Sequence, residues 1–323
     1  TLRRLTSVLG LSPQQVADIE EQLESKASFL PVLVKRNLTL NQSMIIETHL
    51  PELPGAEVME VLQRFYPHQR AFAHIVGYVG SVSAKDLKAN PRRLYRMPNF
   101  KIGKQGLERV VNQRLLGDPG FKRIEVNARG RHLREISRLS PKTGDNVALT
   151  LSHDLQLLAQ ECLDQHRAGA IVLLSVKTGE VMACCSHPSF DPNQFVRGFS
   201  TTEWKDLLNN PDKPLNNKAL RGVYAPGSTY KMIVMLAAMK AGMSIKRSVN
   251  CTGYIEVSNQ RFHCWKKGGH GRVDMHDSLV NSCDIFYYEV AQKLGLEAIN
   301  EIAEQFGFGR TVSSDFEAME ASG

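Results

Sequence analysis

A dense cluster of turn-forming residues, Pro-Lys-Thr-Gly-Asp at 141–145, separates two parts of the chain that have different hydrophobic patterns. Before it, short helical and strand-like segments alternate with irregular stretches, whereas the periodicity after it is regular. A chain of 323 residues is too long for one small domain, and each part is large enough to bury a core. We therefore predict an α+β, non-catalytic domain at 1–146 and a second domain at 147–323.

Within the first part, four segments carry local structural signals. Ser12 is a typical N-cap and Pro13 a typical first helical residue, so a helix is predicted to begin there. A second helix is predicted at 40–50 and a strand at 58–66. Residues 125–136 resemble a hairpin whose turn lies at 128–130.

The second part opens with a predicted short strand at 147–151. Helical periodicity then covers 154–166. Two apolar runs, 169–175 and 180–186, are separated by a short turn sequence at 176–179. This pattern predicts a helix followed by a β-hairpin.

The charge of the chain limits the kinds of molecule that it is expected to bind. The formal net charge is +7, and basic residues are concentrated in the first half, as at 92–93, 129–134 and 138. Such a stripe could contact nucleic acid or an anionic membrane surface, although a solvated face is the commoner explanation. No zinc-finger spacing on a helix and no aromatic stacking motif accompanies it, so we predict no nucleic-acid partner. The apolar fraction of 42% excludes a disordered chain.

The apolar runs are too short to cross a bilayer, which takes about 18–20 residues. The most apolar stretch, 232–243, is interrupted by Lys240 and is predicted to be a buried core helix. The chain begins with Thr1 rather than Met. We expect it to be a soluble piece of a longer protein.

The sharpest local signal is Tyr-Ala-Pro-Gly-Ser-Thr-Tyr-Lys at 224–231. It predicts a turn that leads into an apolar helix, with Ser228 at the helix N-terminus and Lys231 one turn later on the same face. A serine hydroxyl needs a base to become a nucleophile, and a lysine can serve if its surroundings favour the neutral amine. Taken alone, the tetrapeptide is better explained by a serine N-cap and an exposed lysine, and its context decides otherwise.

A second element, Ser282-Cys283-Asp284, follows about fifty residues later. A serine in a triplet of this type can relay a proton between the nucleophile and the leaving group. Asp284 stands where Asn is common, and an ionised Asp only accepts hydrogen bonds. We therefore predict that Asp284 is a charge partner of Lys231, with helix capping as the alternative.

Together these residues resemble the first two active-site motifs of the class B, monofunctional penicillin-binding proteins. The resemblance extends over nearly the whole chain and rests on further segments at 64–67, 73–78, 103–108, 116–120, 126–131, 149–156, 188–195, 265–271 and 306–309.

The resemblance implies a pedestal domain followed by an α/β transpeptidase domain, whose antiparallel sheet is flanked by helices. It implies acyl transfer by Ser228 from the stem peptides of peptidoglycan or their lipid-linked precursors, and acylation of the same serine by β-lactams. Implied partners are a membrane-embedded glycan polymerase of the SEDS type and an elongation scaffold protein. The implied location is the periplasmic face of the bacterial inner membrane, with the anchor outside this chain. Catalysis would need no cofactor.

The third motif of this family, Lys-Ser/Thr-Gly, does not follow Asp284. Two Lys-Thr-Gly triplets, at 142–144 and 177–179, precede the nucleophile and have the context of turns, so we exclude them from the site. We expect the domain to be incomplete at its C-terminal end and the chain as it stands to be inactive.

Four residues of the second part have a pattern that suits a metal: Cys251, Cys264, His270 and Cys283. Three thiolates and one imidazole form the tetrahedral shell of a closed, structural zinc site. A Cys251–Cys264 disulfide and unlinked thiols are the alternatives. The other cysteines, 162, 184 and 185, are predicted to be core residues or bystanders.

Two other functions share parts of this chemistry. A serine β-lactamase uses the same Ser-x-x-Lys pair, but it also needs a base that activates water and would lack the first domain. A non-catalytic penicillin-binding sensor or scaffold could bind its ligand at Ser228 without turnover. Sustained hydrolysis of nitrocefin would indicate the first, and full function after Ser228→Ala would indicate the second.

Overall fold

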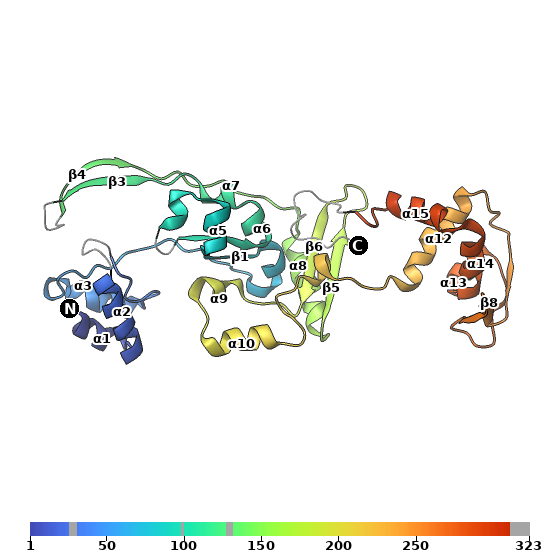
Figure 1. The fold of residues 1–323 in the computed structure, drawn as a ribbon, viewed down its shortest axis with the longest axis horizontal. Helices are drawn as coiled ribbons and strands as arrows, with labels where there is room; N and C mark the ends of the chain where they lie inside the picture. Colours follow the sequence, from blue (N-terminus) through green and yellow to red (C-terminus); the bar gives the residue numbers. More distant parts are fainter. Residues whose placement is uncertain (26–30, 98–99, 127–131, 311–323) are drawn as a thin grey trace. The chain divides into compact units, whose positions relative to one another are not determined.

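The computed structural model describes residues 1–25, 31–97, 100–126 and 132–310, and it divides into two compact units, Thr1–Leu215 and Asn216–Gly323 (Figure 1). This division lies at a different place from the domain boundary predicted after residue 146, which stays a prediction. In both units the strands pair only as two-stranded antiparallel sheets within the described ranges.

The helices of the first unit are α1 (Leu2–Leu9), α2 (Pro13–Ser25), α3 (Leu40–Thr48), α4 (Ala73–Val76), α5 (Ala84–Ala89), α6 (Gly106–Val110), α7 (Asn112–Leu116), α8 (His153–Asp164), α9 (Pro192–Arg197) and α10 (Thr201–Asn209). Its 3-10 helices are η1 (Leu50–Glu52), η2 (Gln69–Ala71) and η3 (Arg93–Arg96). Its strands are β1 (Tyr78–Ser81), β2 (Lys101–Gln105), β3 (Phe121–Val126), β4 (His132–Leu139), β5 (Gly169–Leu174) and β6 (Val181–His187).

The second unit contains α11 (Lys218–Arg221), η4 (Gly227–Tyr230), α12 (Lys231–Lys240), α13 (Met275–Val280), α14 (Asp284–Leu294) and α15 (Leu296–Gln305). Its strands are β7 (Val249–Cys251), β8 (Tyr254–Val257), β9 (Gln260–His263) and β10 (Gly271–Val273).

The first three helices form a small cluster of their own around Leu5, Leu9, Ile19 and Ile46. The predicted start of α2 is confirmed: the Ser12 N–H donates to the Gln15 side chain, and the Gln15 N–H donates to the Ser12 hydroxyl. These reciprocal bonds satisfy amide groups that lack a partner inside the helix.

Two predicted strands are wrong. Residues 58–66 run as an irregular segment, because no neighbouring strand takes up their backbone groups. At its end, the Tyr66 N–H donates to the Asn193 Oδ1, and the Asn193 Nδ2 donates to the Tyr66 carbonyl. Residues 147–151 are also irregular; the Thr150 hydroxyl donates to the Val181 carbonyl, and the Ser152 N–H donates to that of Met182. The predicted hairpin is formed by β3 and β4, but its turn at 128–130 lies outside the described residues.

The helix and hairpin predicted after residue 150 are confirmed as α8, β5 and β6, and α8 packs against β6 (Figure 1). Ala159 and Leu163 of α8 meet Ala183 and Cys185 of β6 in a small core. Buried Gln156 ties the helix to the strand, because its side chain bonds both the N–H and the carbonyl of Cys184. Cys162 is exposed, whereas Cys184 and Cys185 are buried.

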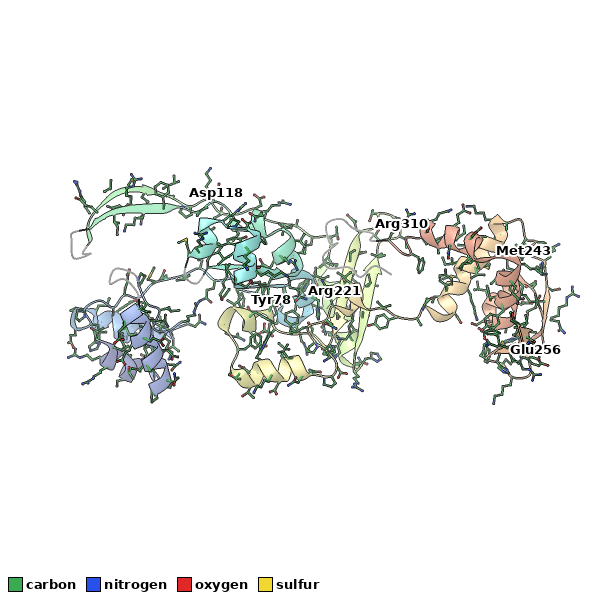
Figure 2. The ribbon with its side chains drawn as sticks, in the orientation of Figure 1. Tyr78, Asp118, Arg221, Met243, Glu256 and Arg310 are labelled. Carbon is green, nitrogen blue, oxygen red and sulfur yellow. The ribbon has the colours of Figure 1, made fainter. Side chains whose placement is uncertain are left out.

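Aromatic contacts join β1 to α9 in the same unit. The ring of Tyr78, labelled in Figure 2, stacks on Phe195 with centroids 3.6 Å apart, and Phe190 meets both rings edge-on. Because aromatic pairs of this kind bury large areas, they fix α9 against the β1–β2 pair.

The second unit is built around α12, which packs on α14 and α15 (Figure 1). Its core includes Ala237, Ala238, Phe286, Val290 and Ile302. The small side chains of α12 let its neighbours approach closely, so the predicted buried helix is confirmed. Among the described helices, none is both long and apolar enough to span a membrane.

Candidate active site and cysteine cluster

Ser228 lies in η4, the tight turn that leads into α12. Ser228 lies at the N-terminus of a helical segment, as predicted, but this first turn is a 3-10 turn and the α-helix itself begins at Lys231. Gly227 has a φ of 57°, which favours glycine, and the Thr229 hydroxyl donates to the carbonyl of Pro226. These features wind the backbone more tightly there than in an α-helix.

Ser282 lies between α13 and α14 and reaches both residues of the first motif. Its Oγ is 2.7 Å from the Ser228 Oγ, and the Lys231 Nζ donates to it over 3.0 Å. The same ammonium donates to the Ser282 carbonyl over 2.8 Å. Ser282 therefore connects the two groups by hydrogen bonds through its hydroxyl.

The backbone at Ser282 is unusual. Its φ is 50°, in the left-handed region that residues other than glycine seldom adopt, at a cost of about 1–3 kcal/mol. The following N–H, that of Cys283, donates to the Ser278 carbonyl over 2.8 Å. The surrounding turn thus holds Ser282 in the one conformation that points its hydroxyl at Ser228.

Asp284 is the first residue of α14 and lies against Lys231. Its Oδ1 accepts from the Lys231 Nζ over 2.6 Å. The side chain of Lys231 is 12% exposed, and that of Asp284 is 23% exposed. A pair so sheltered is screened less than a surface pair. The structure thus brings the four residues predicted for the site together, while their catalytic roles stay predictions.

Two residues that the sequence did not single out also contact this group. The Trp265 N–H donates to the Asp284 Oδ2 over 3.1 Å, and its indole Nε1–H donates to the Asn281 carbonyl over 3.0 Å. The ring of Tyr287 lies 5.6 Å from the Lys231 Nζ, and burial raises the pKa of its hydroxyl. Trp265 begins the 265–271 segment of the family resemblance and directly follows Cys264, but neither signal assigned it a role at the site.

The two rejected triplets lie in the first unit. Residues 177–179 form the turn between β5 and β6, and Lys142 pairs with Asp118 in an isolated bridge. The described part of the second unit contains no Lys-Ser/Thr-Gly sequence after Asp284.

The four predicted metal ligands also converge. The Sγ atoms of Cys251, Cys264 and Cys283 and a ring nitrogen of His270 all lie within 4.8 Å of one another. The His270 Nδ1 is 3.6 Å from the Cys251 Sγ and 3.5 Å from the Cys264 Sγ. The three cysteines are buried and are free thiols. Burial raises the pKa of the Cys283 thiol, and a bound cation would favour its thiolate.

Two glycines let the segments that carry these ligands approach. A Cβ on Gly269 would lie 2.1 Å from the Cys251 carbonyl oxygen, and one on Gly253 would lie 2.2 Å from that of Lys267. Both have positive φ values, 74° and 99°. Side chains at either position would push the 267–270 segment away from Cys251.

The comparisons with known proteins agree with this architecture. Residues 1–149 match the family described as penicillin-binding protein dimerisation domain, and residues 169–323 match the penicillin-binding protein transpeptidase domain. The peptidoglycan D,D-transpeptidase MrdA of Escherichia coli K12 is 36% identical over 329 residues, which cover 100% of this chain and 52% of that protein.

Two solved structures are similar as well. The complex between penicillin-binding protein 2 and MreC from Helicobacter pylori matches with a TM-score of 0.83 and 25% identity, covering 96% of this chain and 58% of that chain. A peptidoglycan synthase complex that coordinates polymerization and crosslinking matches with a TM-score of 0.73 and 28% identity, covering 95% and 57%.

The chain spans about half the length of the curated relatives that it matches. Both the dimerisation and the transpeptidase regions are represented in it, the dimerisation region first. The chain belongs to the penicillin-binding protein family, within which its relatives are the peptidoglycan D,D-transpeptidases of the penicillin-binding protein 2 type.

Proposed function

We propose that the protein to which this chain belongs is a serine D,D-transpeptidase that cross-links the stem peptides of peptidoglycan. One observation carries the proposal: the Ser228 Oγ shares a 2.7 Å hydrogen bond with the Ser282 Oγ, to which the Lys231 Nζ donates. This is a nucleophile joined to a base through a second hydroxyl, the arrangement that activates serine for acyl transfer.

In the first step, the Ser228 Oγ attacks the penultimate D-Ala carbonyl of a stem peptide. Its proton passes through the Ser282 hydroxyl to the Lys231 Nζ, which must hold a neutral amine at that moment. The resulting ammonium is stabilised by Asp284, 2.6 Å away. When the tetrahedral intermediate collapses, the C–N bond breaks, the proton returns to the leaving nitrogen, and D-Ala departs.

In the second step, the amine of a neighbouring stem peptide attacks the ester on Ser228. The amine loses a proton to the same relay, the new amide bond forms, and the Ser228 hydroxyl is regenerated. A β-lactam would acylate Ser228 by the same first step, but its leaving nitrogen stays tethered in the opened ring. That tether leaves no free site for the incoming amine, so the adduct persists.

Intact-mass measurement of the full-length protein tests the proposal. Incubation with benzylpenicillin should add one penicillin mass, and Ser228→Ala should abolish the adduct. Ser244→Ala, at an exposed serine of the same unit, is the matched control and should keep it. Rapid loss of the adduct with continued hydrolysis of nitrocefin would instead indicate a β-lactamase.

We also propose that Cys251, Cys264, His270 and Cys283 hold a structural Zn²⁺. Tetrahedral zinc, with bonds of about 2.3 Å to sulfur and 2.0 Å to nitrogen, separates these ligand atoms by about 3.5 Å. The observed distances between the cysteine sulfurs and the His270 Nδ1, 3.5 and 3.6 Å, fit this separation between ligand atoms. The ion would supply no chemistry to acyl transfer; it would brace the segment on which Ser282 and Asp284 lie.

A metal assay on protein purified without chelator tests the zinc proposal. We expect about one zinc per chain, lost in Cys251→Ser and retained in Cys162→Ser, the control at an exposed cysteine. Protein with no zinc and two fewer free thiols would support the Cys251–Cys264 disulfide instead.

For location and partners, we propose the periplasmic face of the inner membrane, an elongation scaffold protein and a membrane-embedded glycan polymerase. The similarity to the MreC complex and to the peptidoglycan synthase complex supports this. Pull-down of the full-length protein should recover both partners, and Ser228→Ala should leave recovery unchanged because the site is not needed for docking. Failure to recover either partner would contradict this part of the proposal.

A further inference from the structure

Trp265 lies at the outer edge of the site and is 65% exposed. An exposed tryptophan contributes little to a core, yet this one makes two hydrogen bonds with the segment that carries the second motif. Its main-chain N–H reaches Asp284, and its indole N–H reaches the carbonyl of Asn281. The residue thus holds the segment on both sides of Ser282.

The first bond determines how the Asp284 carboxylate is turned. The Oδ1 atom faces the Lys231 Nζ at 2.6 Å, while the Oδ2 atom accepts from the Trp265 N–H at 3.1 Å. With both oxygens engaged, the carboxylate plane cannot rotate without breaking one bond. The position of the Lys231 ammonium is therefore tied to the backbone at Trp265.

The second bond acts on the peptide that precedes Ser282. That residue has a φ of 50°, so its conformation persists only where the surroundings impose it. The indole N–H fixes the Asn281 carbonyl over 3.0 Å, on the side where the strained residue begins. Losing this bond would leave the Ser282 turn free to relax and would move its hydroxyl away from Ser228.

Trp265 is also joined to the cysteine cluster. It follows Cys264 directly, and its ring meets the His270 ring edge-on with centroids 5.3 Å apart. Cys283, the cluster member on the second motif, lies between Ser282 and Asp284. A change in the arrangement of Cys264 and His270 would therefore shift Trp265, and Trp265 would shift Asp284.

We propose that Trp265 is a positioning residue, through which the ligand state of the Cys251–Cys264–His270–Cys283 cluster controls the rate at which Ser228 is acylated. The inference rests on the proposed acyl transfer and on zinc as the ligand of the cluster. Trp265 touches no reacting atom; it acts through Asp284 and through the turn at Ser282.

The test uses the full-length protein, purified with its metal, and the variant Trp265→Phe, which keeps an aromatic ring but lacks the indole N–H. Trp204→Phe is the control, since Trp204 lies on α10 in the other unit. Three quantities are measured: the acylation rate constant at saturating benzylpenicillin, the dissociation constant of the noncovalent complex, and the melting temperature.

Trp265→Phe should lower the acylation rate constant about tenfold, the effect of losing roughly one hydrogen bond in the transition state. The dissociation constant and the melting temperature should stay at their wild-type values. A purely structural role would not lower the acylation rate constant while leaving these two quantities unchanged. Trp204→Phe should change none of the three.

The link to the cluster has its own readout. Treatment with a chelator should change the tryptophan emission of the wild type and of Trp204→Phe, but not that of Trp265→Phe. In the wild type, the acylation rate should fall in step with the emission change.

The inference is overturned if Trp265→Phe acylates at the wild-type rate, or if emission changes on chelation while acylation does not. It is also overturned if chelation leaves the emission unchanged. A wild-type protein that forms no adduct at all would overturn the proposed acyl transfer itself, and the inference with it; the two failures are told apart by this one measurement.

Discussion

The Lys231 Nζ and the Asp284 Oδ1 lie 2.6 Å apart in a sheltered pair, at the point where the nucleophile turn meets the second motif. The pair has a consequence for charge. Any proton that arrives at Lys231 creates an ammonium beside a carboxylate, so the positive charge formed in the proposed acylation would be neutralised where it forms.

Asp284→Asn should therefore slow acylation by about 10–100-fold, because the ammonium loses its counter-charge while the side-chain shape is kept. The second-order acylation constant with benzylpenicillin measures the effect. Glu297→Gln, at an exposed carboxylate in the first turn of α15, is the control and should leave the constant unchanged. Equal constants for Asp284→Asn and the wild type would contradict the assigned role.

Two substitutions at Ser282 separate the effect of its backbone conformation from the effect of its hydroxyl. Both Ser282→Ala and Ser282→Gly remove the proton relay and should lower the acylation constant about 10²-fold or more. Only glycine adopts a φ of 50° without penalty, so Ser282→Gly should be about 1 kcal/mol more stable than Ser282→Ala. Urea unfolding gives the stabilities. If Ser282→Gly acylated normally, the hydroxyl would have no part in the relay.

The cysteines outside the cluster should differ in reactivity. Burial raises the pKa of Cys184 to about 11, and burial together with its neighbour raises that of Cys185 to about 12, whereas Cys162 is exposed. At about pH 8, iodoacetamide should modify Cys162 first, because the thiolate is the reactive form. Peptide mass mapping of the folded protein checks the order, and unfolding in urea should abolish the difference. Early labelling of Cys184 would contradict the packing of β6 against α8.

In the first unit, Asp86 gives a prediction for the effect of pH. Hydrogen bonds from Lys104 and Ser83 lower the pKa of its carboxyl from 3.8 to about 2. Because the pKa is lowered, the ionised Asp86 carboxylate contributes its full stabilisation at pH values above its ordinary pKa. That stabilisation is lost as the pH falls through about 2. The pair is partly exposed, so this contribution is about 1 kcal/mol or less.

Asp86→Asn should accordingly be less stable than the wild type at pH 7 by that amount, and the gap should shrink as the pH is lowered from about 5 towards 2. Urea unfolding at several pH values measures it. A gap that stays constant over this range would show that the loss comes from capping of α5 and not from the charge.

Local patterns sufficed to predict α2, α8, α12 and the β5–β6 hairpin, since each is specified by its own periodicity and end signals. They failed at 58–66 and 147–151, because a strand exists only when a distant segment supplies its partner. The four residues of the acylation site and the four of the cluster could be named from residue type and spacing. The role of Trp265 could not be named, although the residue lies in a segment of the family resemblance, since its bond to Asp284 comes from a main-chain N–H, a group that every residue except proline carries.

The turn at Ser228 shows a further limit. The spacing of Ser228 and Lys231 predicted a helix N-terminus at Ser228, which the structure confirms, but it did not indicate that this first turn is a 3-10 turn. The type of turn leaves the contacts of the site unchanged, because the side chains of Ser228 and Lys231 both reach Ser282. The distances between elements depend on packing, which single-sequence patterns do not contain.

Cys283 lies between two residues of the acylation site, with its own side chain turned into the buried cluster. Neighbouring side chains of this short segment therefore contact two different sites, the acylation site and the cysteine cluster. A shift of the segment that changes one site also changes the other. On the proposed acylation of Ser228 by β-lactams, a substitution that displaced Ser282 or Asp284 to exclude a drug would also pull Cys283 away from Cys251, Cys264 and His270. Selection under a β-lactam should then favour changes at the rim of the site over changes within the Ser282–Asp284 segment.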